Sequence, residues 1–180
     1  MNSNILIRSA RLEDCSMLGH VQLTSWKTMF PAAQIAADEY LAQFSDEERA
    51  EAWQSMFARL PDRVVYVAET FDQQVVGFAS SVIAKPDEPY ACELLAIHIL
   101  PEYRAQGIGR RLIAATARHW HGQGCTSLWL WTLQHNPARA VYEHLGGVLA
   151  GERPDQSCKN DVCIDFVEVA YGWARIEDLF

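Results

Sequence analysis

No apolar run in this chain approaches the roughly 20 residues that a membrane-spanning helix needs. The start of the chain, Met1–Ile5, has neither a basic region nor a long apolar stretch, so no secretory signal is expected. We therefore expect a cytoplasmic protein without a membrane partner. Hydrophobic residues make up 49% of the chain and charged residues 21%, which is too apolar for a disordered protein.

Positive charge is also scarce. The chain has 15 Lys and Arg against 23 Asp and Glu, a formal net charge of −8, which opposes nonspecific binding to nucleic acid. No nucleic-acid partner is expected, and a cationic small molecule is favoured instead. The same balance also fits a protein whose negative charge only keeps it soluble.

Cysteines are few, and their spacing shows no pairing. Five cysteines, an odd number, fit reduced thiols better than a disulfide framework. Cys158 and Cys163 would make half a metal site, but no His or Cys pair at a matching spacing completes it, so no metal is expected. Without an internal repeat or a linker, the 180 residues predict one domain, residues 1–180.

The most informative stretch is a predicted strand that runs into a helix. Ala91–Leu100 is almost continuously apolar, which favours a strand buried on both faces, and Pro101 ends it. In the helix that follows, one face is predicted to point to the core; its residues are Ile108, Leu112, Ala115, Thr116 and His119. The glycines of this stretch therefore lie where the helix starts.

Gly107 and Gly109 leave the first-turn amides of that helix without covering side chains. Such amides have no intrahelical acceptor and bind phosphate well, so this turn predicts a pyrophosphate site flanked by Arg104 and Arg110. Neither the dinucleotide fingerprint nor the P-loop is complete here. A plain strand-to-helix turn with solvent-facing arginines is the alternative.

The hexapeptide Arg104-Ala105-Gln106-Gly107-Ile108-Gly109 resembles the Arg/Gln-x-x-Gly-x-Gly/Ala signature of the GNAT superfamily of acyl-CoA-dependent N-acetyltransferases. Leu95–Pro101 resembles that family's fourth strand, and Asn136–Gly147 resembles its second motif. The resemblance implies acetyl-CoA as co-substrate. The cofactor-binding residues that it implies are Ile97, His98 and Ile99 through their backbone, then Arg104, Ala105, Gln106, Gly107, Ile108, Gly109, Arg110 and Asn136.

The remaining elements are predicted from periodicity and from turn residues. The first half of the chain is predicted to hold a strand near residues 4–8, a helix from Glu13-Asp14 to Phe30-Pro31, a helical region over 34–60 broken near Phe44-Ser45, and a hairpin of 63–70 and 74–84. After the glycine turn and its helix come a strand over 127–133 and a helix from Asn136-Pro137 to Gly146-Gly147. The last two strands, over 148–151 and 162–172, are joined by a polar loop. This order predicts an α/β (α+β) fold: a mixed sheet of six or seven strands, flanked by helices and splayed between two parallel central strands.

Two residues are predicted to carry the proton transfers of acetyl transfer. Glu93 interrupts an apolar strand, so burial should raise its pKa and suit it to act as a base; a solvated strand end is the alternative. Tyr142 matches the family's tyrosine, which implies that it protonates the leaving thiolate; a core tyrosine is the alternative. His98, His135 and His144 are weaker proton-relay candidates.

The acceptor is predicted to be a small, cationic primary amine, with Trp26 as the acceptor-binding residue. Other aromatic residues between positions 30 and 57 could also line an acceptor pocket, but the spacing of an amphipathic helix explains them as core residues. Trp129–Leu133 lacks the glutamate that similar enzymes acting on protein N-termini carry, which argues against that class. A noncatalytic acyl-CoA-sensing module and a protein lysine acetyltransferase stay open as alternatives, as do a monomer and a homodimer.

Overall fold

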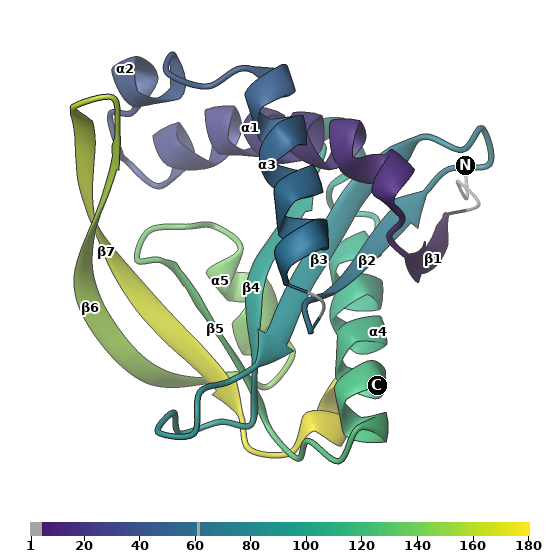
Figure 1. Ribbon diagram of the computed structural model, residues 1–180. Coiled ribbons are helices and arrows are strands. Elements are labelled where there is room, and N and C mark those ends of the chain that lie inside the picture. Colours follow the sequence, from purple (N-terminus) through teal and green to yellow (C-terminus); the bar gives the residue numbers. More distant parts are fainter. Residues whose placement is uncertain (1–4, 61) are drawn as a thin grey trace.

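The computed structural model describes residues 5–60 and 62–180, and its centre is one seven-stranded sheet (Figure 1). The strands are β1 (Leu6–Ser9), β2 (Val64–Glu69), β3 (Val75–Ile83), β4 (Cys92–Ile99), β5 (Leu128–Leu133), β6 (Val148–Lys159) and β7 (Val162–Trp173). Their order across the sheet is β1-β2-β3-β4-β5-β7-β6. Only β4 and β5 pair in parallel, so the predicted mixed sheet with two parallel central strands is confirmed.

Helices cover both faces of the sheet (Figure 1). The α-helices are α1 (Cys15–Ala32), α2 (Asp38–Leu41), α3 (Asp46–Arg59), α4 (Ile108–Gly122) and α5 (Arg139–His144), and the short 3-10 turns are Leu12–Asp14, Pro101–Tyr103 and Ile176–Leu179. Helices α1 and α3 pack together on one face, and α4 packs against β2, β3 and β4 on the other. Within the described part of the chain, no helix is long and apolar enough to cross a membrane.

The sheet divides between β4 and β5. These strands pair only over Cys92–Leu94 and Leu128–Leu130, although β4 continues to Ile99 and β5 to Leu133. Each of these two strands stays paired with its outer neighbour to its end. Strand β3 pairs with β4 as far as Ile99, and β7 pairs with β5 as far as Leu133. The predicted splay between the parallel strands is confirmed.

A second, smaller core closes one end of the molecule. It combines buried apolar side chains of α1, the connection between α1 and α2, α2, β5 and β7, namely Leu23, Phe30, Ala33, Ala37, Tyr40, Leu41, Leu133 and Ile164. The Tyr40 hydroxyl also lies 2.7 Å from Ser157 Oγ, which joins α2 to β6. The tip of the β6–β7 hairpin therefore packs beside α2, as Figure 1 shows.

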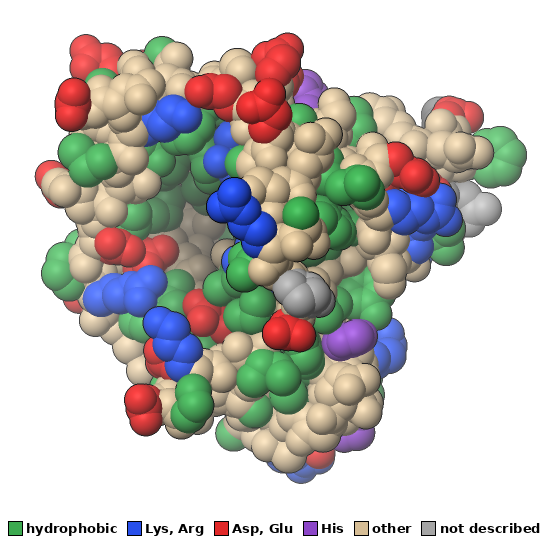
Figure 2. Space-filling model, in the orientation of Figure 1, with side chains coloured by type: hydrophobic (Ala, Val, Ile, Leu, Met, Phe, Trp, Pro, Cys, Tyr) green, Lys and Arg blue, Asp and Glu red, His purple; other side chains and the backbone are tan. Residues whose placement is uncertain are grey.

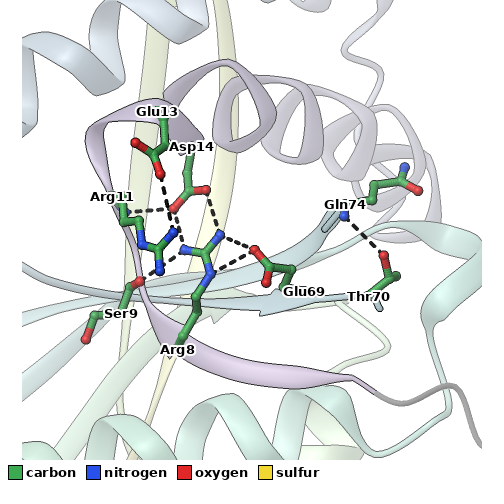
Figure 3. Close-up of polar contacts among 8 residues, drawn as sticks. All are labelled: Arg8, Ser9, Arg11, Glu13, Asp14, Glu69, Thr70 and Gln74. Carbon is green, nitrogen blue, oxygen red and sulfur yellow. Dashed lines mark hydrogen bonds and ion pairs between the residues drawn. The ribbon is translucent and has the colours of Figure 1, made fainter. Parts of the chain in front are cut away.

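Arg8 of β1 organises the opposite edge of the sheet (Figure 3). Its guanidinium donates to both carboxylate oxygens of Asp14, at 2.7 and 2.9 Å, and its Nε donates to Glu69 of β2 at 2.8 Å. Burial alone would raise the pKa of Asp14, but the hydrogen bonds from Arg8 and the Arg11 amide hold that pKa below its ordinary value. One arginine thus joins β1, β2 and the turn that precedes α1.

The predicted end of α1 at Phe30-Pro31 is wrong, since α1 continues to Ala32 with Pro31 inside its last turn. The helix also starts later than predicted, because residues 12–14 form a 3-10 turn. Phe30 and Ala33 are buried in the second core. Tertiary packing therefore extends the helix past a proline that would disfavour it in an isolated peptide.

The predicted polar loop after Gly151 is also wrong, because β6 extends to Lys159. Only Asn160 and Asp161 connect β6 to β7, with φ of 48° and 65°, as the tight hairpin turns that follow strand twist require. As an edge strand with mostly exposed side chains, β6 carries polar residues and Pro154, so it lacks the alternation that predicts a half-buried strand.

Cys158 and Cys163 form a disulfide, so the expectation of reduced thiols is wrong for this pair. The two residues lie directly opposite one another on β6 and β7. The sequence pattern predicts a polar loop between these two cysteines, and not a tight turn. It therefore does not predict that two cysteines only five residues apart pair across a hairpin. Cys15, Cys92 and Cys125 have free thiols.

The buried face of α4 differs in part from the prediction. Ile108, Leu112 and Thr116 are buried as expected, whereas Ala115 and His119 are only half-buried. The other buried side chains of this helix are Ile113, Ala114, Ala117 and Trp120. Contacts with β2, β3, β4 and the C-terminal turn widen the buried face beyond one stripe.

Candidate active site

A cavity of about 410 Å³ lies where α1, the end of β4, the start of α4 and α5 come together. Ten of the eleven predicted cofactor-binding residues line it: Ile97, His98, Ile99, Arg104, Ala105, Gly107, Ile108, Gly109, Arg110 and Asn136. The eleventh, Gln106, is not among the lining residues, and its side-chain amide donates to the Glu102 carbonyl. The glycine-containing turn therefore lines a cavity, although residues 104–107 are themselves exposed.

The turn before α4 has a backbone conformation that suits glycine. Gly107 has φ of 76° and forms the N-cap of α4, and a side chain there would be strained although no atom lies within 4 Å of a Cβ. At Gly109, a Cβ would lie 3.4 Å from Ile99 Cδ1. The first-turn amides of α4 consequently lie bare at the cavity wall, where they favour an anion.

Arg104 lines the cavity and makes three hydrogen bonds to other residues that line it. Its Nε donates to the Ile99 carbonyl at 3.0 Å, and its Nη2 donates to Thr28 Oγ1 at 2.8 Å and to Ser25 Oγ at 3.3 Å. In this arrangement Arg104 fastens the turn to α1. Arg110 is then the arginine of the turn with more freedom to reach a phosphate.

A second cavity, of about 290 Å³, lies on the other side of the splay. Aromatic side chains in its walls include Trp26, the predicted acceptor-binding residue, with Phe30, Tyr40, Trp131 and Phe166. It opens on the face in Figure 2, where the molecule is hollowed between the β6–β7 hairpin and α3. The two cavities share Met29, Ile97, His98, Asn136 and Tyr142, so they meet where β4 and β5 diverge.

Tyr142 lies at this junction, on α5. The residue is only 5% exposed, and its hydroxyl makes no hydrogen bond to any residue that the structure describes. Burial raises the pKa of this phenol, which keeps the hydroxyl protonated at neutral pH. Tyr142 is therefore a protonated donor at the meeting point of two cavities, as a general acid must be.

Asn136 caps the turn before α5 but does not open the helix, so the predicted start at Asn136-Pro137 is wrong. The helix begins at Arg139, and Asn136 Oδ1 accepts the Ala138 amide at 3.0 Å. Asn136 Nδ2 also donates to Thr132 Oγ1 on β5 at 2.9 Å. With both side-chain atoms engaged, Asn136 fixes the position of α5 relative to β5.

The His98 side chain crosses from β4 to α1. Its Nδ1 lies 3.1 Å from Ser25 Oγ, and its ring packs edge-on against Trp26 with centroids 6.4 Å apart. Burial, with smaller contributions from the charges of Arg104 and Arg49, lowers the pKa of His98 to about 4. His98 is thus neutral at physiological pH and acts as a hydrogen-bonding group more readily than as a base.

Glu93 lies at the start of β4, opposite Trp129, and is not among the residues that line either cavity. Burial raises the pKa of Glu93, the charges of Glu88 and Glu168 raise it further, and that of Arg153 opposes the rise. Of these neighbours, Glu168 lines the second cavity. Glu93 therefore has the elevated pKa of a base but lies outside direct reach of the junction.

The prediction missed the polar residues that α1 supplies to the site. Ser25 and Thr28 line the first cavity, and Gln22 lines the second. Gln22 and Ser25 are buried on the same helix as Leu18 and Val21. Polar side chains on the apolar face of a helix were the available signal, because a buried polar group requires a partner.

Three comparisons place this chain among known proteins. The model of the acetyltransferase (GNAT) family matches residues 30–147. The chain is 30% identical over 176 residues to YuaI of Bacillus subtilis (strain 168), named as an uncharacterized N-acetyltransferase, with 97% of this chain and 96% of that protein covered.

Solved structures share the fold at lower identity. An N-acetyltransferase from Staphylococcus aureus Mu50 has a TM-score of 0.70 at 20% identity, covering 97% of this chain and 99% of that one. PaiA N-acetyltransferase from Thermoplasma acidophilum, in complex with coenzyme A, has a TM-score of 0.63 at 22% identity, covering 92% and 98%. The family match spans β4, the glycine turn, α4, β5 and α5, and on that basis this chain belongs to the acetyltransferase (GNAT) family.

Proposed function

We propose that this protein transfers the acetyl group of acetyl-CoA to the primary amine of a small acceptor, and that this amine is cationic before it reacts. The amine attacks the thioester directly, without a covalent enzyme intermediate. One observation carries the proposal: two cavities, one with bare helix amides and one with aromatic walls, meet at Tyr142. Such a junction lets a donor and an acceptor approach from opposite sides of the sheet.

The first cavity suits acetyl-CoA. Its pyrophosphate would bind the amides of the first α4 turn, with Arg110 adding charge. The pantetheine would follow Ile97–Ile99, because this part of β4 has no β5 partner and leaves backbone groups available. The thioester then reaches the junction, where an amide of β4 would bind the oxyanion.

The chemical step needs three proton transfers. The amine nitrogen attacks the thioester carbonyl carbon, the carbon–sulfur bond breaks, and the thiolate takes its proton from the Tyr142 hydroxyl. The Tyr142 phenolate then regains a proton from the nitrogen of the newly acetylated amine. Glu93 takes a proton from the incoming ammonium through water, because it does not line the cavities itself. The elevated pKa of Glu93 suits this role near neutral pH.

The second cavity favours a small acceptor. The tip of the β6–β7 hairpin and α2 close one end of it through Tyr40, Ser157 and Phe166. A protein lysine acetyltransferase needs an open groove for a polypeptide, and a cavity closed at one end disfavours that alternative. Glu168 also lines the cavity wall, but its carboxylate pairs with Arg153 at 2.7 Å, so an ammonium group would be held by the aromatic faces and not by a free negative charge.

A thiol-release assay with acetyl-CoA and a panel of polyamines, aminoglycosides, amino acids and basic peptides tests this proposal. Calorimetric titration with acetyl-CoA accompanies it. We expect binding and turnover on one class of small amine. Binding without turnover on any amine would favour the acyl-CoA-sensing alternative, and absence of binding would refute the assignment of the first cavity.

A further inference from the structure

Three cations lie close to the second cavity, and they differ in their partners. Arg153 pairs with Glu168 at 2.7 Å, and Lys159 pairs with Glu48 at 3.3 Å. Arg49 of α3 has no carboxylate within ion-pair distance among residues 5–60 and 62–180. Figure 2 shows the rim of the hollow where charges of both signs gather.

Arg49 is held against the cavity wall by neutral groups. Its guanidinium lies 5.1 Å from the Trp26 ring centroid and 5.9 Å from that of Phe44, and its Nη2 donates to Gln22 Oε1 at 2.5 Å. Trp26 and Gln22 both line the second cavity. Arg49 is not among the residues that line the cavity, but it contacts two that are, so it lies at the edge of the space that a bound acceptor would occupy.

The hydrogen-bonding capacity of Arg49 is largely unused. Its Nε is buried without a partner in the described structure, and its Nη1 also has no acceptor there but is not buried. Burial lowers the pKa of Arg49, but a guanidinium stays charged at any physiological pH. A partly buried charge with unpaired donors is costly, and an anionic ligand would offset that cost.

We propose that Arg49 binds a carboxylate of the acceptor, so that the acceptor is an amino-acid-like molecule with an amine at one end and a carboxylate at the other. This inference rests on the proposed function and specifies its substrate class. The planar guanidinium matches a carboxylate, which takes two hydrogen bonds from its fork. A single arginine beside a cavity of about 290 Å³ suits one such group on a small molecule that extends past the Trp26 side chain.

The position of Arg49 also suggests how the acceptor lies. The Trp26 ring separates the Arg49 guanidinium from the His98 ring, and His98 belongs to the junction of the cavities. An acceptor with its carboxylate at Arg49 would pass along the Trp26 face to place its amine near the thioester. Acceptors with different spacings between amine and carboxylate should therefore react at different rates.

Matched pairs of acceptors test the inference in the thiol-release assay. Each pair differs only by the carboxylate: β-alanine with ethylamine, γ-aminobutyrate with propylamine, δ-aminovalerate with butylamine, and lysine with cadaverine. We expect the carboxylate-bearing member of at least one pair to react with a kcat/KM about tenfold higher or more. In Arg49→Gln this ratio should fall by about tenfold, mainly through KM.

Arg59→Gln, the same change at an exposed arginine of α3, is the matched control and should keep the wild-type ratio. If Arg49→Gln does not fold, Arg49→Lys keeps the charge but lacks the fork, and the ratio should still fall. Equal loss on both members of each pair would give Arg49 a purely structural role, and a preference for the plain amines would overturn the inference. Absence of turnover on every amine would refute the proposed function itself.

Discussion

At the residue scale, the environment of Tyr142 combines burial, a raised pKa and an unbonded hydroxyl at the junction of two cavities. A core tyrosine normally satisfies its hydroxyl with a partner, because an unpaired buried polar group costs free energy. The hydroxyl of Tyr171, close to Tyr142, is satisfied in that way by Arg139 and Glu143. The contrast between the two tyrosines favours a role for Tyr142 in catalysis.

Tyr142→Phe removes only the hydroxyl, so we expect kcat to fall by roughly a hundredfold or more while the Kd for acetyl-CoA changes little. Steady-state kinetics and calorimetry measure the two effects. Tyr66→Phe, at a half-buried tyrosine of β2 outside both cavities, is the matched control. An unchanged kcat in Tyr142→Phe would remove the general-acid assignment.

The titration of His98 makes the free energy of unfolding depend on pH. The pKa of His98 falls from 6.5 to about 4 on folding, because the buried ring disfavours the charged form. The unfolded chain therefore binds a proton that the folded chain does not, and the free energy of unfolding should decrease as pH falls from about 6.5 toward 4. This contribution of His98 to the free energy of unfolding is fully present above pH 6.5 and amounts to roughly 3 kcal/mol.

Urea unfolding at a series of pH values across that interval checks this prediction. His98→Gln cannot titrate, so its stability should depend less steeply on pH than that of the wild type. His121→Gln, at an exposed histidine of α4, should keep the wild-type dependence. If His98→Gln also keeps the full dependence, other groups cause it.

At the scale of elements, the end of β4 and the start of α4 act together. The strand presents Ile97 and Ile99 toward Gly109, and the turn places the bare helix amides beside them. Arg104 then ties the turn to α1 through Ser25 and Thr28. The proposed anion site would thus depend on three elements and not on the glycine turn alone.

Gly107→Ala tests that site, because a methyl group would strain a residue with positive φ and cover the amides. Gly124→Ala is a close control: Gly124 also has positive φ, at 88°, and open space around it, but does not line the cavities. Both changes should cost roughly 1 kcal/mol of stability. Only Gly107→Ala should weaken acetyl-CoA binding, by about tenfold, and equal affinities in the two variants would contradict the pyrophosphate assignment.

At the scale of the whole molecule, the first cavity joins parts that are far apart in sequence: α1, β4, α4 and α5. A ligand that contacts all of them should stabilise the folded state as one unit. At a concentration a hundred times its Kd, acetyl-CoA should add about 2.7 kcal/mol, which corresponds to a rise in Tm of roughly 5–10 °C.

Thermal unfolding with and without acetyl-CoA measures this rise. S-acetyl-pantetheine, which lacks the pyrophosphate and nucleotide, should give a clearly smaller rise at the same concentration. Equal shifts with both compounds would indicate that the amides of α4 contribute little to binding. No shift with acetyl-CoA at saturating concentration would argue that the ligand binds elsewhere or not at all.

Local features of the sequence determined much of the fold. Apolar runs and turn residues predicted the β2–β3 hairpin, the end of β4 before Pro101 and the break near Phe44-Ser45 that precedes α3. The glycines at positions 107 and 109 located the start of α4, and they predict an anion site there. These features depend on steric limits and hydrogen bonds within a few residues, which a sequence records directly.

The tertiary structure alone decided what depends on residues far apart in the chain. Packing in the second core carried α1 past Pro31, and pairing with β7 made β6 a long edge strand whose polar residues resemble a loop. Contacts between α1 and β4 brought Ser25 to His98, and contacts between α3 and α1 placed Arg49 behind Trp26. Such neighbours are set by how the elements pack, and no local pattern in a single sequence encodes that.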